Sequence, residues 1–125
     1  MHFDALVVNG HVVGHGQEPR RLALGITGER VAAVLEPSAS GHTAGRTIDA
    51  GGRHVFPGLI DPHTHFGLAA GLADWGTESR SAAAGGVTTV LNFLMSGEPY
   101  DAEYRETRAA ADQQSIVDYG LHLCP

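Results

Sequence analysis

The sequence contains no lysine, only one cysteine and no long hydrophobic run. Cys124 alone cannot form an internal disulfide, which favours the reducing cytosol. The start of the chain has no basic stretch followed by the apolar run of about 7–15 residues that marks an export signal. No window approaches about 18 uninterrupted apolar residues, the length that a membrane-spanning helix requires. We therefore expect a cytoplasmic protein without a membrane partner.

Basic residues are also scarce, with 8 arginines against 14 acidic residues and a net charge of -6 over 125 residues. The acidic excess is concentrated in residues 63–125, which carry eight acidic residues and three arginines. Nucleic-acid binding requires a basic surface, so no nucleic-acid partner is expected. The hydrophobic content of 42% is too high for a disordered chain and indicates a folded globular protein.

Residues 1–54 consist of short apolar runs separated by glycine turns. Asn9-Gly10 and Gly28-Glu29 each stand between two such runs, which predicts two β-hairpins. Residues 38–45 form a polar loop of small residues, and Thr47–Asp49 is one more short strand. These pieces predict a small antiparallel sheet, which has too few apolar residues to be stable by itself.

Residues 55–125 alternate strand-like and helix-like segments. The expected elements are a strand at Val55–Asp61, a helix from about residue 74 to Ala84, a strand at Val87–Met95, a helix at Tyr100–Ser115 and a strand at Ile116–Leu123. Gly85-Gly86 ends the first helix, and residues 96–99 form a turn. The order strand, helix, strand, helix, strand predicts an α/β unit whose parallel strands are covered on both faces.

His63 and His65 lie two residues apart where the first of these strands ends. Alternate residues of a strand share a face, so both imidazoles can bind one metal ion at about 2.0–2.1 Å. With eight histidines in the chain, about half of one His-x-His pair is expected by chance, so the spacing alone is weak evidence for a metal site. Its position at the carboxyl end of a buried strand, before a glycine-rich loop, favours an active site. The alternative is a pair of ordinary hydrogen-bonded histidines.

Three other residues have two interpretations each. Asp61 shares the face of His63 and could accept the second ring N–H of a ligating histidine, or it could simply form a turn before Pro62. Phe66 could pack against a ring-shaped substrate, or it could be a core aromatic. His122 could line a pocket on the third strand, although a packed strand histidine is the better interpretation.

The runs Val55–Phe66 (VFPGLIDPHTHF), Ala82–Val90 (AAAGGVTTV) and Val117–His122 (VDYGLH) together resemble the start of the amidohydrolase superfamily, closest to hydantoinases and dihydropyrimidinases. The resemblance implies that residues 1–54 are strands of a small β-sandwich. It also implies that residues 55–125 are the first three strands of a (β/α)8 barrel of the TIM type. Two divalent metal ions, usually zinc, are implied, with His63 and His65 as the ligands from the first strand.

In those enzymes a carboxylated lysine bridges the two metals, and later strands supply two more histidines and a catalytic aspartate. This chain has no lysine and stops at the third strand. We therefore expect an N-terminal fragment that contains no catalytic residue of its own and is inactive and poorly soluble when expressed alone.

The implied activity is hydrolysis of cyclic amides, such as hydantoins or dihydropyrimidines, by an enzyme that forms dimers or tetramers. Asp118-Tyr119-Gly120 is hydantoinase-like and favours a cyclic amide or imide without a required carboxylate. Phe66-Gly67-Leu68 stands where dihydroorotases and allantoinases typically carry an acidic or arginine-containing segment, which disfavours dihydroorotase. The alternatives are an allantoinase or dihydroorotase type of cyclic amidohydrolase, or a non-catalytic scaffold of the same fold.

Overall fold

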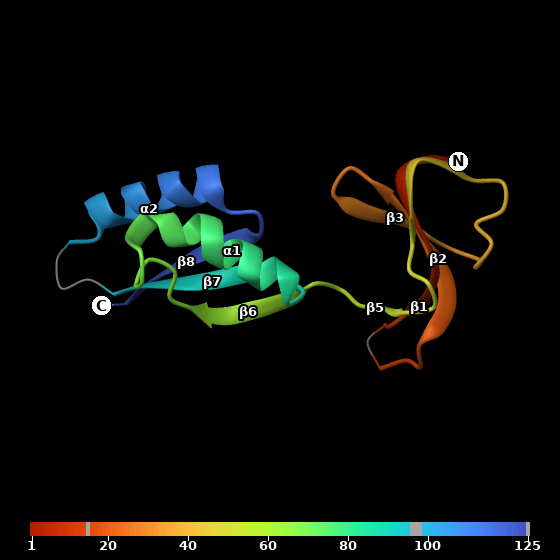
Figure 1. The fold of residues 1–125 in the computed structure, drawn as a ribbon, viewed down its shortest axis with the longest axis horizontal. Coiled ribbons are helices and arrows are strands. Elements are labelled where there is room, and N and C mark those ends of the chain that lie inside the picture. The colour runs from red at the N-terminus through yellow and green to blue at the C-terminus, as the bar shows by residue number, and fades with distance from the viewer. Residues whose placement is uncertain (15, 96–98, 125) are drawn as a thin grey trace. The chain divides into compact units, whose positions relative to one another are not determined.

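The computed structural model describes residues 1–14, 16–95 and 99–124 (Figure 1). The chain forms two compact units, residues 1–57 and residues 58–125, and each unit has its own sheet and its own core. Within the described ranges, no helix combines the length and the apolar character needed to cross a bilayer.

The first unit is a five-stranded sheet. Its strands are β1 (His2–Val12), β2 (Arg20–Thr27), β3 (Arg30–Leu35), β4 (Thr43–Asp49) and β5 (His54–Val55). They follow the order β3-β2-β1-β4, with β5 also paired to β1. Pairing is antiparallel between β1 and β2 and between β2 and β3, but β4 and β5 run parallel to β1. The expectation of an antiparallel sheet is therefore wrong for two strands, because residues 36–42 carry the chain back to the start of β1.

One of the two predicted hairpins is present. Thr27 pairs with Arg30 around a turn at Gly28, whose φ of 58° suits glycine. The hairpin expected at Asn9-Gly10 is wrong, because β1 continues through it. Asn9 has a φ of 57° but lies at an irregularity in the pairing between Val7 and Gly10, while β2 pairs with β1 on both sides. The turn signal instead marks a bulge.

The core of the first unit is small. Phe3 and Leu6 from β1 are 4% and 5% exposed, and they pack with Ala23 and Ala39. A Cβ at Gly25 would lie 2.6 Å from Cε1 of Phe3, so the close approach of β2 to this ring requires glycine. The ring of Phe3 and the lack of a side chain at Gly25 together determine how β1 packs against β2.

The second unit is a three-stranded parallel sheet with helices on one face (Figure 1). Its elements are β6 (Leu59–Thr64), the 3-10 turn η1 (Gly71–Ala73), α1 (Asp74–Ala84), β7 (Val87–Met95), α2 (Asp101–Gln114) and β8 (Asp118–Cys124). The strand order is β6-β7-β8. The mixed α/β class and the alternation of strands and helices are confirmed. The turn expected over residues 96–99, including Ser96, falls mostly outside the described residues.

The apolar run Val55–Asp61 is not one strand. Val55 pairs with Val12 in the first sheet, whereas β6 begins at Leu59 in the second. The chain divides into its two units after Pro57, three residues beyond residue 54. The run stays apolar across this division because both of its ends contribute to a sheet.

The helix-covered face of the second sheet contains its core. Trp75 and Val90 are 0% exposed and pack with Ala110 and Ala111 of α2. The Ser79 hydroxyl donates to the carbonyl of Trp75 at 2.5 Å and accepts the N–H of Ile116 at 3.2 Å. Trp75 lies in the first turn of α1 and is fully buried, so it anchors the start of this helix on the sheet.

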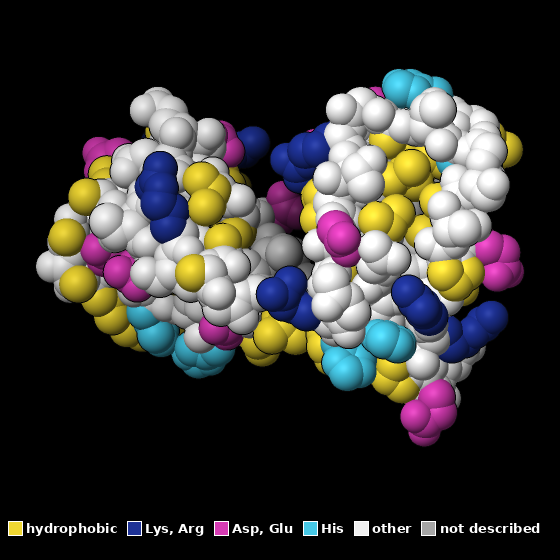
Figure 2. Space-filling view, turned by 45° about the vertical axis from the view of Figure 1, so that its right-hand side comes forward, with side chains coloured by type: hydrophobic (Ala, Val, Ile, Leu, Met, Phe, Trp, Pro, Cys, Tyr) yellow, Lys and Arg dark blue, Asp and Glu magenta, His cyan; other side chains and the backbone are white. Residues whose placement is uncertain are grey.

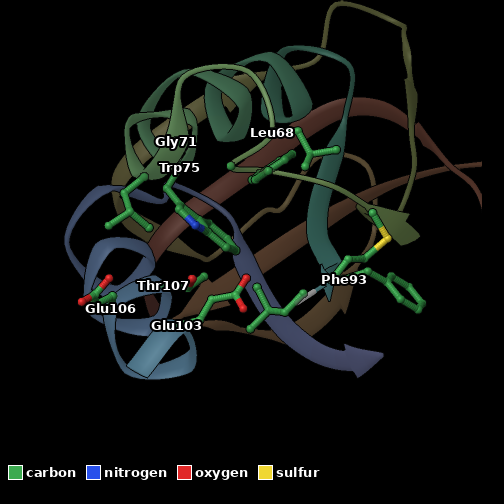
Figure 3. Close-up of a pocket in the computed structure, with 12 residues that line it drawn as sticks. Leu68, Gly71, Trp75, Phe93, Glu103, Glu106 and Thr107 are labelled. Atoms are coloured by element: carbon green, nitrogen blue, oxygen red, sulfur yellow. The ribbon is translucent and has the colours of Figure 1, made fainter. Parts of the chain in front are cut away.

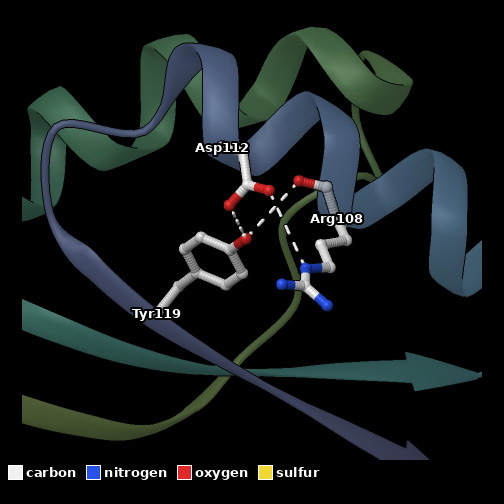
Figure 4. A network of polar contacts seen from close by, with 3 residues as sticks. All are labelled: Arg108, Asp112 and Tyr119. Carbon is white, nitrogen blue, oxygen red and sulfur yellow. Dashed lines mark hydrogen bonds and ion pairs between the residues drawn. The ribbon is translucent and has the colours of Figure 1, made fainter.

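A polar network holds α2 against β8 (Figure 4). The Tyr119 hydroxyl donates to the carboxylate of Asp112, which also forms an ion pair with Arg108 at 3.8 Å. Burial of the phenol, followed by the hydrogen bond to Asp112, raises the pKa of Tyr119. The network connects β8 to the last turns of the helix.

The opposite face of the second sheet is uncovered within the described part of the chain. Leu59 and Ile60 of β6 are 59% and 65% exposed, and Met95 at the end of β7 is 60% exposed. The expectation that these strands are covered on both faces is therefore wrong here, because both helices pack on the same side. The histidine pair lies on this uncovered face.

Candidate metal centre

His63 and His65 converge at the carboxyl end of β6. Their Nε2 atoms are 3.1 Å apart, and their ring centroids are 4.9 Å apart at an interplanar angle of 70°. Two nitrogens that each lie about 2.05 Å from one tetrahedral zinc ion are about 3.3 Å apart. The spacing of the two nitrogens therefore suits one ion, and it equally fits a hydrogen bond between the two rings.

Phe93 of β7 connects this pair to a third histidine. Its ring stacks on His63 with centroids 4.2 Å apart and on His122 with centroids 4.7 Å apart, at 19° in both cases. Phe93 and His122 are register partners, so all three rings form a row across β6, β7 and β8. His122 is exposed on the uncovered face, and the space-filling view shows histidines at the surface of this unit (Figure 2).

Asp61 interacts with the backbone of the histidine pair. Its Oδ1 accepts the N–H of His63 at 3.1 Å, as expected for a turn-forming aspartate before Pro62. Support of a ligating ring by this carboxylate stays a prediction. His65 Nδ1 is buried and has no hydrogen-bond partner among the described residues. In a ligating histidine, the N–H of the second ring nitrogen usually donates to an acceptor. Among the described residues, no such acceptor lies beside Nδ1 of His65.

The donor set fits part of a metal site. Two imidazoles with converging nitrogens suit zinc, for which histidine is a common ligand. Across residues 1–14, 16–95 and 99–124, no group of three or more His, Cys, Asp or Glu side chains could hold a metal ion. The described residues therefore provide two ligands, and a catalytic zinc site usually has three from the protein.

Asn92 contacts the backbone beside the pair and is 0% exposed. Its Oδ1 accepts the N–H of Phe66 at 2.5 Å and the hydroxyl of Thr64 at 3.2 Å. Its Nδ2 donates to the carbonyl of Phe66 at 3.2 Å. Asn92 is thus an internal bridge between β7 and the end of β6. The one available signal was a polar residue inside the buried run VLNFLM.

The loop after Phe66 is held by Asp74. This carboxylate, 3% exposed, accepts the backbone N–H groups of Gly67, Ala69 and Ala70, each at 3.0 Å. Burial alone would raise the pKa of Asp74, but the three N–H donors outweigh burial and place the pKa below its ordinary value. An ionised carboxylate therefore fixes the segment that follows the histidines.

Phe66 is one of the residues that line a pocket of about 300 Å³, which Figure 3 shows from close by. The pocket wall also includes Leu68, Trp75, Met95 and Glu103. Phe66 contacts Trp75 edge to face, with centroids 5.2 Å apart. The half-buried ring thus packs on the core and also lines the pocket, while contact of Phe66 with a substrate stays a prediction. Trp75 Nε1 and Glu103 Oε2 are buried, and the described part of the chain offers neither atom a hydrogen-bond partner.

Comparison with known proteins places the chain in a family. Residues 46–113, which include the histidine pair and Asn92, match the amidohydrolase family. The chain belongs to the amidohydrolase family. The match covers more than half of the sequence, and it extends from the last long strand of the first unit almost to the end of α2.

Individual amidohydrolases match most of this chain. It is 33% identical to a D-hydantoinase of Rhizobium radiobacter, over 97% of this chain and 27% of the relative. It is 30% identical to an allantoinase of Deinococcus radiodurans, over 93% and 27%. A solved D-aminoacylase with a binuclear metal centre aligns with a TM-score of 0.58 and 36% identity, over 72% of this chain and 18% of that one. The chain spans about a quarter of the length of these curated relatives.

Proposed function

We propose that this chain is the N-terminal part of a metal-dependent cyclic amidohydrolase that opens the C–N bonds of hydantoins or dihydropyrimidines. The observation that carries the proposal is the 3.1 Å approach of the Nε2 atoms of His63 and His65. The relatives named D-hydantoinase and allantoinase support a small cyclic amide as the substrate. A retained histidine pair favours an enzyme over a non-catalytic scaffold.

The proposed architecture is a small β-sandwich over residues 1–54 and an incomplete (β/α)8 barrel over residues 55–125. Three parallel strands with both helices on one side support this assignment, because a barrel has helices outside and strands inside. The uncovered face would then be the interior of the barrel. The histidines lie at the carboxyl end of β6, where barrel enzymes have their active sites.

In this proposal His63 and His65 bind the first of two zinc ions. Ions held there would lower the pKa of a water and polarise the ring carbonyl of the substrate. Phe66 forms part of the substrate pocket, and Asp61 orients the end of β6 through the N–H of His63. The carboxylated lysine, the further histidines and the catalytic aspartate are outside this sequence, so the chain alone is inactive.

The test uses the complete polypeptide that carries this chain. Zinc is measured by elemental analysis, and ring opening is measured with hydantoin, dihydrouracil and allantoin. His63→Ala and His65→Ala should each lower bound zinc and abolish ring opening while the fold is retained. His54→Ala, an exposed histidine of the first unit, is the matched control and should behave like the unmodified protein. Unchanged zinc in both site variants would refute the metal assignment.

A further inference from the structure

We propose that Asn92 is a positioning residue that sets the orientation of the metal-binding pair by holding both neighbours of His65, Thr64 through its side-chain hydroxyl and Phe66 through its backbone. This role rests on the proposed metal site. Thr64 and Phe66 are the two sequence neighbours of His65, and both bind the Asn92 amide. With its neighbours fixed to β7, His65 has little freedom to change the direction of its ring.

The bonds account for most of the capacity of this amide. Oδ1 accepts two hydrogen bonds, at 2.5 Å and 3.2 Å, and Nδ2 donates one at 3.2 Å. Both backbone polar groups of Phe66 are thereby bound by one side chain that is 0% exposed. A buried network of this kind is rigid when satisfied and costly when broken. The end of β6 is therefore fastened to the centre of the sheet.

Packing alone does not explain an amide at this position. Asn92 lies between Val90 and Leu94 on the helix-facing side of β7, and both neighbours are buried apolar residues. An apolar residue would continue this row. The hydrogen bonds of Asn92 go to Thr64 and Phe66 rather than to α1 or α2.

Phe93, the next residue of β7, contacts the other histidine of the pair. Phe93 points to the opposite face and stacks on His63 at 4.2 Å. Asn92 thus holds Thr64 and Phe66, the neighbours of His65, from one side of the sheet, while Phe93 supports the ring of His63 from the other. Two consecutive residues of β7 control both members of the pair.

The chemistry predicts how replacements differ. Asn92→Ala removes all three bonds and leaves the Phe66 N–H and carbonyl without partners. Asn92→Asp keeps the two acceptor contacts, but it loses the donor and places a carboxylate beside the Phe66 carbonyl. Thr64→Val removes one hydroxyl with little change in volume. The three variants therefore form a graded series.

The experiment titrates the metal-free complete protein with Zn²⁺ in the presence of a competing chelator, and then with Co²⁺ to record its visible spectrum. Asn92→Ala should weaken binding by about 10- to 100-fold, the usual effect of losing a group that orients a metal ligand. Asn92→Asp and Thr64→Val should weaken it less, and the Co²⁺ bands should shift. Ser79→Ala, another 0% exposed polar residue of this unit, is the control and should bind like the unmodified protein.

Wild-type affinity and an unchanged Co²⁺ spectrum in both Asn92→Ala and Thr64→Val would overturn the role of Asn92. If Asn92→Ala does not fold, Thr64→Val decides the question by the same two measurements. Failure of the unmodified protein to bind Zn²⁺ would instead refute the metal site itself. Equal losses in Ser79→Ala would assign the effect to general stability and also overturn the proposal.

Discussion

The ring of Phe93 lies parallel to that of His63, with centroids 4.2 Å apart and planes within 19°. An aromatic pair of this kind contributes about 0.5–1.5 kcal/mol beyond its buried area. Phe93→Leu should therefore weaken zinc binding by about 2- to 10-fold through a less restricted His63 ring. Chelator competition measures the change, and Phe93→Tyr, which keeps the ring, is the control. Equal affinity of Phe93→Leu and the unmodified protein would show that the stack does not support the ligand.

Phe66 should determine which ring substituents are accepted. Because its ring lines the pocket, Phe66→Ala enlarges the apolar wall without removing a ligand. The ratio of kcat/KM between bulky and small 5-substituted hydantoins should change by about 1–3 kcal/mol, the scale of an apolar pocket contact. Leu72→Ala tests a second wall residue. A uniform loss for every substrate would contradict a role in selectivity.

Asp74 should make the second unit sensitive to acid. Its folded-state pKa lies below the ordinary 3.8, so its contribution to stability is present above that value and is lost as pH falls through the folded-state pKa. Asp74→Asn removes the charge that three N–H groups bind. The unfolding midpoints of the complete protein and this variant should differ at pH 7 and converge below pH 3.8.

The control for this prediction is Asp101→Asn, which changes an exposed aspartate in the first turn of α2. Urea unfolding at pH 7, 5 and 3 should show a much smaller pH-dependent difference for this variant. A gap between Asp74→Asn and the unmodified protein that stays constant over this range would contradict the electrostatic explanation.

Trp75 should be the most costly truncation in the second unit. It is 0% exposed and packs edge-on against Phe66 and Tyr119, with centroids 5.2 and 5.1 Å away. Trp75→Ala should lower the free energy of unfolding by about 3–5 kcal/mol. Trp75→Phe should cost clearly less, because it keeps an aromatic ring and Nε1 has no hydrogen-bond partner among the described residues. Equal losses in the two variants, measured by urea unfolding, would contradict this explanation.

Local signals in the sequence were sufficient for part of the fold. The strand Val87–Met95 was predicted with its exact ends because a β-branched run begins after two glycines and the strand is buried. The hairpin at Gly28 was predictable from turn chemistry. Asn9-Gly10 misled because a bulge and a hairpin can both use a left-handed asparagine. Only the partner strand β2 distinguishes the two, and that pairing is not local.

The candidate site, too, was predictable where the signal is local and not where it depends on pairing between strands. The His63 and His65 pair was found because strand periodicity alone puts both rings on one face. The contribution of Asn92 depends on the register between Thr64 and Asn92, and the orientation of His122 depends on its pairing with Phe93. Neither register can be calculated from a single strand, so these two residues had no decisive signal in the sequence.

The outer strands of the second sheet, β6 and β8, each pair with β7 alone within the described residues. Their free backbone N–H and C=O groups adjoin exposed Leu59, Ile60 and Leu123. Such an edge is a template onto which another strand can add. As an isolated polypeptide, this chain should therefore self-associate through these two edges. Its light scattering should increase with concentration and with heating.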